Sequence, residues 1–196
     1  MDKSNDSLLQ KAMEGDINAF QQLFADFQAP LKSYLYRLLA NRNDAEDLTH
    51  DTFIRAYDKL SLFKGTSSLK TWVFQIATNL AWNLLKKRKR WTEDVAAQAK
   101  TLVIHDAELA GKLVHLTETS PDTVYDIKEH IDTCFSCIGK NLPIENQIAV
   151  ILKDVYTFSI KEIALIIDKT EGVVKYLLQD GRHTMQNIFT RRWRRR

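Results

Sequence analysis

NDAEDLTHDTFIRAYDKLSLFKGTSSLKTWVFQIATNLAWNLLKKRKR, residues 43–90, is the most informative segment of this chain. It passes from an acidic helical segment, through a short loop that contains Gly65, into an amphipathic segment that ends in five consecutive basic residues. This order suggests a surface for a protein partner followed by a surface for nucleic acid.

The second half of this stretch predicts a long amphipathic helix. Apolar side chains recur at helical spacing from Leu69 to Leu85 and predict one broad buried face. Gly65 suits a turn, and Ser67 or Ser68 is expected to cap the helix that follows. The basic end is equally compatible with an ordinary solvated helix end, so the charges alone do not establish nucleic-acid binding.

The motifs DAEDLTHDTFIRAY and FKGTSSLKTWVFQIATN, followed by the basic run, resemble the second conserved region of bacterial sigma factors of the extracytoplasmic-function group. The resemblance covers about Ala19 to Arg90. It implies that the acidic helix binds the clamp coiled coil of core RNA polymerase. It also implies that the loop and the next helix capture and melt the promoter's minus-ten element and hold a flipped non-template base.

The resemblance assigns two sets of candidate site residues. The polymerase set comprises Asp44, Glu46, Asp47, Asp51 and Arg55. The strand-capturing set comprises Lys64, Gly65, Ser67, Ser68, Lys70, Gln75 and Asn79, with Lys86 in the basic end.

The amino-acid composition limits the broad class of protein to which this chain can belong. The chain has 196 residues, of which 44% are hydrophobic and 27% charged, and its formal net charge is only +3. Positive charge is instead concentrated at residues 86–90 and 191–196, and the arginine-rich end suits either phosphate contacts or a solubilising tail. No apolar run approaches the roughly 20 residues that span a bilayer, and no signal-peptide pattern is present. We expect a cytoplasmic protein with no membrane insertion.

Only six Gly and three Pro favour an all-α fold. Apolar and aromatic residues between Ser7 and Ala40 predict a pair of helices, with Pro30 near the start of the second. Asn41-Arg42-Asn43 is expected to form a turn, with Asp44 as the N-cap of the acidic helix. Two small helical domains joined by a linker are expected: residues 1–90, a linker at 91–121, and residues 122–196.

The second domain carries a predicted helix-turn-helix. Ser159 and Glu162 form a capping box, Asp168-Lys169-Thr170 is a short turn, and a second helix starts near Glu171. The stretch from Leu142 to Met185 resembles the fourth conserved region of sigma factors, which reads the minus-thirty-five element. On that resemblance the DNA-facing side chains are Lys175, Tyr176, Gln179 and Arg182, with Lys169 and Thr170 near phosphates. A carboxylate at Asp180 would face phosphate and repel it.

His130, Cys134 and Cys137 have the spacing H-x3-C-x2-C, which resembles the zinc motif of the anti-sigma proteins that restrain this group. A structural zinc site normally needs a fourth ligand, and none is evident nearby. Two buried thiols that pack beside Phe135 and Ile138 are the alternative, since free Cys is often part of a core. We therefore predict no metal and no cofactor, and leave a zinc or redox role for these residues open.

The sequence contains no phosphate-binding Gly-rich loop, no nucleophile elbow and no recognisable pair of catalytic carboxylates, so we do not expect an enzyme. The favoured hypothesis is a sigma factor, with core RNA polymerase, promoter DNA and an anti-sigma factor as partners. A stand-alone helix-turn-helix regulator is the alternative, and it would bind an operator without polymerase. An adaptor that binds polymerase without starting transcription is a third class.

Overall fold

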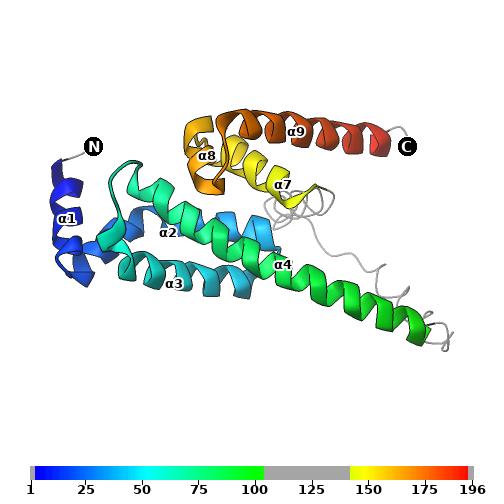
Figure 1. The fold of residues 1–196 in the computed structure, drawn as a ribbon, viewed down its shortest axis with the longest axis horizontal. Coiled ribbons are helices and arrows are strands. Elements are labelled where there is room, and N and C mark those ends of the chain that lie inside the picture. Colours follow the sequence, from blue (N-terminus) through cyan, green and yellow to red (C-terminus); the bar gives the residue numbers. More distant parts are fainter. Residues whose placement is uncertain (1–2, 104–141, 194–196) are drawn as a thin grey trace, which may run out of the picture.

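The structure is a computed structural model that describes residues 3–103 and 142–193. Within these ranges the chain is helical and contains no strand (Figure 1). The first half consists of α1 (Lys3–Met13), α2 (Ile17–Leu39), α3 (Arg42–Asp58), the 3₁₀ turn η1 (Leu60–Leu62) and α4 (Leu69–Val103). The second half consists of α7 (Ile144–Val150), the π-helical turn η2 (Ile151–Val155), α8 (Ile160–Ile167) and α9 (Glu171–Trp193).

Helix α2 contacts α1, α3 and α4 and so lies at the centre of the first half. Asp16 caps it, because its Oδ1 accepts hydrogen bonds from the backbone N–H groups of Asn18 and Ala19 at 2.9 and 3.2 Å. One side of α2 is buried along its whole length, from Ala19 to Leu39. Near the start of α2, the ring of Phe20 contacts that of Phe53 on α3, with centroids 5.3 Å apart. This aromatic packing joins α2 to α3.

Pro30 does not start a new helix, contrary to expectation, but lies inside the continuous helix α2. A proline within a helix removes one backbone hydrogen bond and usually kinks or breaks it. Here Phe27 and Leu31 on either side of Pro30 are both buried. The continuous buried side therefore outweighs the local preference for a break.

The start of α3 also differs from the prediction by about one turn. Asn41, rather than Asp44, is the N-cap, and its Oδ1 accepts a hydrogen bond from the backbone N–H of Asp44 at 3.1 Å. The tripeptide expected as a turn therefore includes the first two residues of the helix.

Helix α4 confirms the predicted long helix and extends beyond it. The side chain of Ser68 accepts a hydrogen bond from the backbone N–H of Thr71 at 3.1 Å and so caps the helix start, as expected for one of the two serines. The helix continues to Val103, so the first part of the expected linker is helical. The remainder of the expected linker lies mainly outside the described residues.

The second half has the predicted helix-turn-helix. Ser159 Oγ accepts from the Glu162 backbone N–H at 3.2 Å, while a Glu162 carboxylate oxygen accepts from the Ser159 backbone N–H at 2.9 Å. This arrangement confirms the capping box. Asp168 ends α8 in the left-handed conformation, with φ of 53°, and α9 begins at Glu171. The all-α fold with two helical parts is therefore confirmed.

The two halves pack against each other along one side of α4 (Figure 1). We call this the interhalf contact and define it as the packing of Tyr156, Phe158 and Glu162 against α2 and α4. The ring of Phe158 lies 5.0 Å from the ring of Phe74. Glu162 accepts a hydrogen bond from Thr71 Oγ1 at 3.1 Å. The interhalf contact was not predicted from the sequence.

Packing between α7 and α9 depends on Gly181. A Cβ atom added there would meet Val150 Cγ2 at 2.9 Å, whereas one added at Gly172 would meet nothing closer than 3.9 Å. We expect Gly172→Ala to stabilise the protein by up to about 1 kcal/mol, because alanine is the better helix former. We expect Gly181→Ala to destabilise it relative to Gly172→Ala by about 1–3 kcal/mol. Urea unfolding of both variants measures this difference, and equal free energies of unfolding would contradict the close approach.

Candidate polymerase and nucleic-acid interfaces

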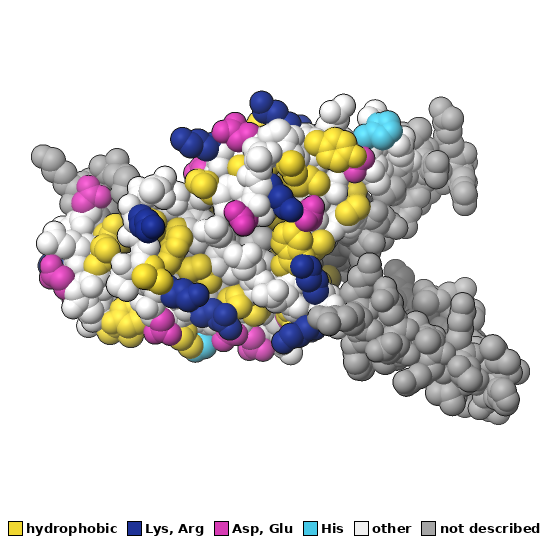
Figure 2. Space-filling view, viewed as in Figure 1, with side chains coloured by type: hydrophobic (Ala, Val, Ile, Leu, Met, Phe, Trp, Pro, Cys, Tyr) yellow, Lys and Arg dark blue, Asp and Glu magenta, His cyan; other side chains and the backbone are white. Residues whose placement is uncertain are grey.

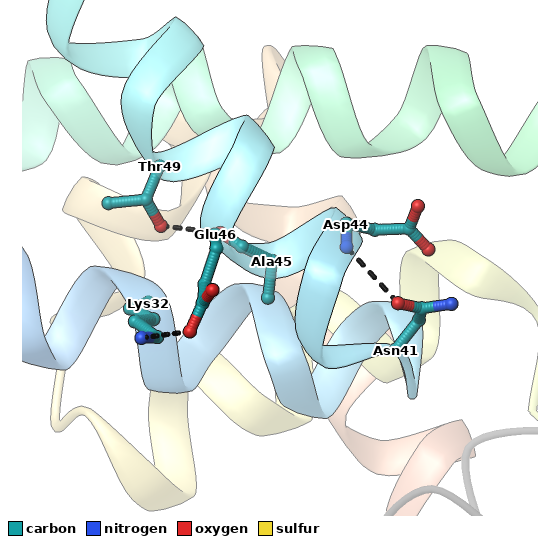
Figure 3. A network of polar contacts seen from close by, with 6 residues as sticks. All are labelled: Lys32, Asn41, Asp44, Ala45, Glu46 and Thr49. Carbon is teal, nitrogen blue, oxygen red and sulfur yellow. Dashed lines mark hydrogen bonds and ion pairs between the residues drawn. The ribbon is translucent and has the colours of Figure 1, made fainter.

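The charged residues of the polymerase set divide into two groups, and Figure 3 shows Asp44 and Glu46 of the first group, with Lys32 bonded to Glu46. Asp44 and Glu46 are engaged within the chain: Asp44 forms an ion pair with Arg88 at 2.6 Å, and Glu46 forms one with Lys32 at 2.5 Å. The hydrogen bond and the charge of Lys32 hold the pKa of Glu46 below its usual value. Asp44 therefore links α3 to α4, and Glu46 links α3 to α2.

Asp47, Asp51 and Arg55 make up the second group. All three are exposed, and none forms a hydrogen bond or ion pair with the described residues. Their spacing of four residues places them in a line on the surface of α3. Of the five residues in the polymerase set, these three form the surface that is open to a partner.

The loop between η1 and α4 is anchored at its base and open at its tip. The ring of Phe63 is buried and lies 5.3 Å from the ring of Trp72. Gly65 adopts a positive φ of 67°, which favours glycine, and the turn leaves Lys64 exposed. Ser68 caps α4 and the Ser67 hydroxyl donates to the Ser68 carbonyl at 3.3 Å, so Lys64 is the loop side chain best placed to contact a ligand.

The structure divides the candidate residues of α4 between two sides of the helix. Gln75, Asn79 and Lys86 follow one another at intervals of four and seven residues, so they lie on one face. Lys70 lies elsewhere, with its ammonium group 5.0 Å from the ring centroid of Phe158. The expected single strand-capturing face is therefore split, and its Lys70 part is covered by the second half.

The start of α9 presents the predicted DNA-facing residues. Lys175, Gln179 and Arg182 line a shallow surface hollow of about 430 Å³, while Tyr176 is 66% exposed beside it. His183 and Gln186 also line this hollow and were missed by the sequence reasoning. They follow Gln179 by four and seven residues, and this helical spacing could have placed them on the same face as Gln179.

Two charged residues of α9 are held by other residues of the second half. Arg182 donates to both carboxylate oxygens of Asp154, at 3.2 and 2.5 Å, and this bond raises the pKa of Arg182 above its usual value. Asp180 accepts a hydrogen bond from Asn146 Nδ2 at 2.8 Å. This hydrogen bond joins α9 to α7, and the expectation that Asp180 would face phosphate stays a prediction.

The turn before α9 gives the two remaining candidates. Thr170 Oγ1 lies 3.4 Å from the backbone N–H of Val173, in the position of a helix cap. Lys169 lies 3.8 Å from a carboxylate oxygen of Glu145. Both side chains are exposed, so neither is prevented from reaching a phosphate.

No group of three or more His, Cys, Asp or Glu residues is arranged to hold a metal ion within residues 3–103 and 142–193. His130, Cys134 and Cys137 lie outside the described residues, so the zinc or redox hypothesis stays untested. Among the described helices, none combines the length and apolar character needed to cross a membrane.

Comparison with known proteins identifies relatives of the chain. Residues 23–91 match the family described as Sigma-70 region 2. The chain is 27% identical over 186 residues to the ECF RNA polymerase sigma-E factor of Haemophilus influenzae, with 94% of each chain covered. It is 27% identical over 180 residues to the sigma-E factor of Escherichia coli, with 92% of this chain and 91% of the relative covered.

Two solved structures share the fold. CnrH, solved in complex with the cytosolic domain of CnrY, matches with a TM-score of 0.68 and 15% identity over 96% of this chain and 98% of that one. The sigma factor RpoE of Bartonella quintana, solved in complex with the anti-sigma factor NepR, matches with a TM-score of 0.63 and 22% identity, over 87% and 96% of the two chains.

Releasing Arg182 from Asp154 should strengthen DNA binding. In Asp154→Asn the guanidinium loses its charged partner and becomes available to phosphate, so we expect tighter binding to duplex DNA. The slope of log affinity against log salt should become steeper by up to about 0.9, the value for one additional phosphate contact. Asp26→Asn, which removes an exposed aspartate of α2, is the control for the change in net charge. Identical salt slopes for the two variants, measured by fluorescence anisotropy, would argue against this role of Asp154.

Proposed function

We propose that this chain, which belongs to the extracytoplasmic-function group of RNA polymerase sigma factors, binds core RNA polymerase and directs promoter-specific initiation of transcription. The observation that carries the proposal is the Sigma-70 region 2 match at residues 23–91, in a chain that resembles sigma-E factors over nearly its whole length. In this role the chain supplies specificity to the polymerase and performs no catalysis itself.

Helix α3 is the proposed docking surface for polymerase. Asp47, Asp51 and Arg55 are exposed in a line along α3 and would pair with charged groups of the partner. The ion pairs of Asp44 with Arg88 and of Glu46 with Lys32 help to hold α3 in place against α4 and α2. Complementary charges of this kind mainly set the rate and specificity of association.

The loop 63–68 and the exposed face of α4 form the proposed strand-capturing surface. Gly65 shapes the loop, Lys64 and Ser67 offer a cation and a hydroxyl, and Ser68 positions the helix start. Along α4, Gln75 and Asn79 offer amides for base edges, and Lys86 offers a cation for the backbone. An amide and a cation on one face suit an unpaired strand, whose base edges and phosphates are both accessible.

The second half is the proposed reader of the minus-thirty-five element. Its recognition helix is α9, and Lys175, Tyr176 and Gln179 are exposed at its start, where such helices contact base edges. Arg182 would join them once it leaves Asp154. An anti-sigma factor is proposed as a further partner, because one structure that shares this fold is a sigma factor bound to an anti-sigma factor.

In vitro transcription tests the proposal directly. Core polymerase should start transcription from a subset of a promoter library only when this chain is added. Transcription that is the same with and without the chain would contradict the proposed function. Operator binding by the chain alone as a dimer, without any effect on transcription by core enzyme, would favour the stand-alone regulator.

Removing the open carboxylates of α3 should weaken binding to polymerase. For Asp47→Asn combined with Asp51→Asn we expect the dissociation constant for core polymerase to rise about tenfold or more, because about 1.4 kcal/mol of lost charge pairing gives that factor. Biolayer interferometry with immobilised core enzyme measures the change. The control is Asp26→Asn, and an equal effect of this variant would show that net charge alone is responsible.

Removing the groups that contact the strand should block melting without affecting docking. For Lys64→Ala combined with Asn79→Ala we expect a sharp fall in open-complex formation, followed by permanganate reactivity of unpaired thymines, with unchanged affinity for core enzyme. Gln22→Ala, on the exposed side of α2 and away from this surface, is the control. Normal melting by the double variant would favour an adaptor that binds polymerase without starting transcription.

A further inference from the structure

We propose that Tyr176 and Val173, at the start of α9, contact the C5-methyl groups of thymine bases in the major groove of promoter DNA. This inference rests on the proposed function, because it concerns the base preference of the same recognition helix. It adds a chemical rule for that preference: the element bound by α9 contains a thymine whose methyl group contributes directly to affinity.

Tyr176 and Val173 form an exposed apolar surface, which we call the apolar pair. Tyr176 is 66% exposed and Val173 is 38% exposed. Because they are three residues apart, they lie on the same side of α9. Long side chains of a helix lean toward its N-terminus, and this direction brings the Tyr176 ring over the turn that contains Val173.

The ring of Tyr176 takes no part in the packing of the second half. It makes no hydrogen bond, ring contact or cation–π contact with the residues that the structure describes. The buried side of α9 is supplied instead by Val174, Leu177 and Leu178. The apolar pair is therefore available to a ligand, and its removal should leave the core of the second half unchanged.

The residues around the apolar pair favour DNA as that ligand. Lys175 is exposed next to Tyr176, and Lys169 is exposed in the turn before α9. Lys175, Gln179 and Arg182 line the adjoining hollow of about 430 Å³. Figure 2 shows hydrophobic side chains between Lys and Arg side chains on the surface of the second half. Cations and an amide around a small apolar surface match a DNA groove, where phosphates flank the base edges.

The major groove offers a specific apolar group to the apolar pair. Its base edges present hydrogen-bond donors and acceptors, and thymine adds the C5-methyl group. Recognition helices contact base edges with their N-terminal residues, and Val173 and Tyr176 lie within the first two turns of α9. Polar neighbours suit the remaining atoms, because the Gln179 amide can pair with adenine and the exposed Glu171 carboxylate can accept from the amino group of cytosine.

Gly172 keeps the approach to the Tyr176 ring open. It lies four residues before Tyr176, on the same face of α9. A Cβ atom added at Gly172 would meet nothing closer than Thr170 Oγ1 at 3.9 Å, so the space beside this position is open. Glycine often occurs where a backbone closely approaches a ligand. The start of α9 can therefore lie close to a base edge without an intervening side chain at position 172.

Modified bases test the contact with the methyl group. The full chain, alone and bound to core polymerase, selects from a library of random duplexes, and the selected sequences should contain a thymine whose preference is lost in Tyr176→Ala. Uracil at that position removes only the methyl group. We expect uracil to weaken binding by the wild-type chain about three- to fivefold, the factor that burial of one methyl group contributes. At the same position 5-methylcytosine should bind better than cytosine.

Four variants identify the side chain that contacts the methyl group. Tyr176→Ala should bind the thymine and uracil duplexes equally, whereas Tyr176→Phe keeps the ring and should keep the preference for thymine. Gln179→Ala should bind both duplexes more weakly but with an unchanged ratio of affinities. Ile17→Ala, which removes a side chain of α2 that is 48% exposed, is the matched control and should behave as the wild type does.

Three results would overturn the inference: no selected thymine depends on Tyr176, the wild-type chain binds thymine and uracil duplexes equally, or the effect of uracil persists in Tyr176→Ala. Equal losses on both duplexes in Tyr176→Phe would show that the hydroxyl binds phosphate instead. Transcription with core polymerase is measured separately. A chain that starts transcription without any dependence on the methyl group contradicts this inference alone, and one that distinguishes thymine from uracil without starting transcription contradicts the proposed function alone.

Discussion

Helix α4 is buried on two sides, and the rest of the structure depends on this double burial. Helix α4 contacts α2 and α3, and its residues Val73 and Ala77 are fully buried. It also receives the second half of the chain, with Phe74 against Phe158. Because Phe74 follows Val73 directly, a single turn of α4 contributes to both packings and joins the two cores into one cluster.

This position of α4 ties the proposed functions together. The helix begins directly after the loop that would hold an unpaired base, and it carries Gln75, Asn79 and Lys86 at intervals of four and seven residues on one face. Helix α3, which carries the proposed docking surface, lies on the side of the first half away from α8 and α9 (Figure 1). The proposed contacts with polymerase and with the unpaired strand thus lie on neighbouring helices of one bundle.

The sequence predicted those features of the fold that depend on residues close together in the chain. The helical periodicity of residues 69–85, the capping box at Ser159 and the turn before α9 were all predicted, because each depends on neighbours within one or two turns. The predicted position of Pro30 near a helix start was wrong, because burial of its neighbours on both sides stabilises a continuous helix despite the tendency of proline to break one. Asp180 and the burial of Phe74 could not be predicted, because their partners lie on helices that are distant in the sequence.

We expect α3 to contact polymerase while α4 contacts the melted strand in the same complex. Photo-crosslinking amino acids placed singly at Asp51 and Asn79, in complexes of this chain with core polymerase and promoter DNA, measure both contacts. Asp51 should crosslink to a polymerase subunit and Asn79 to the non-template strand near the minus-ten element. Crosslinks from Asp51 to DNA, or from Asn79 to no nucleic acid, would contradict this expectation.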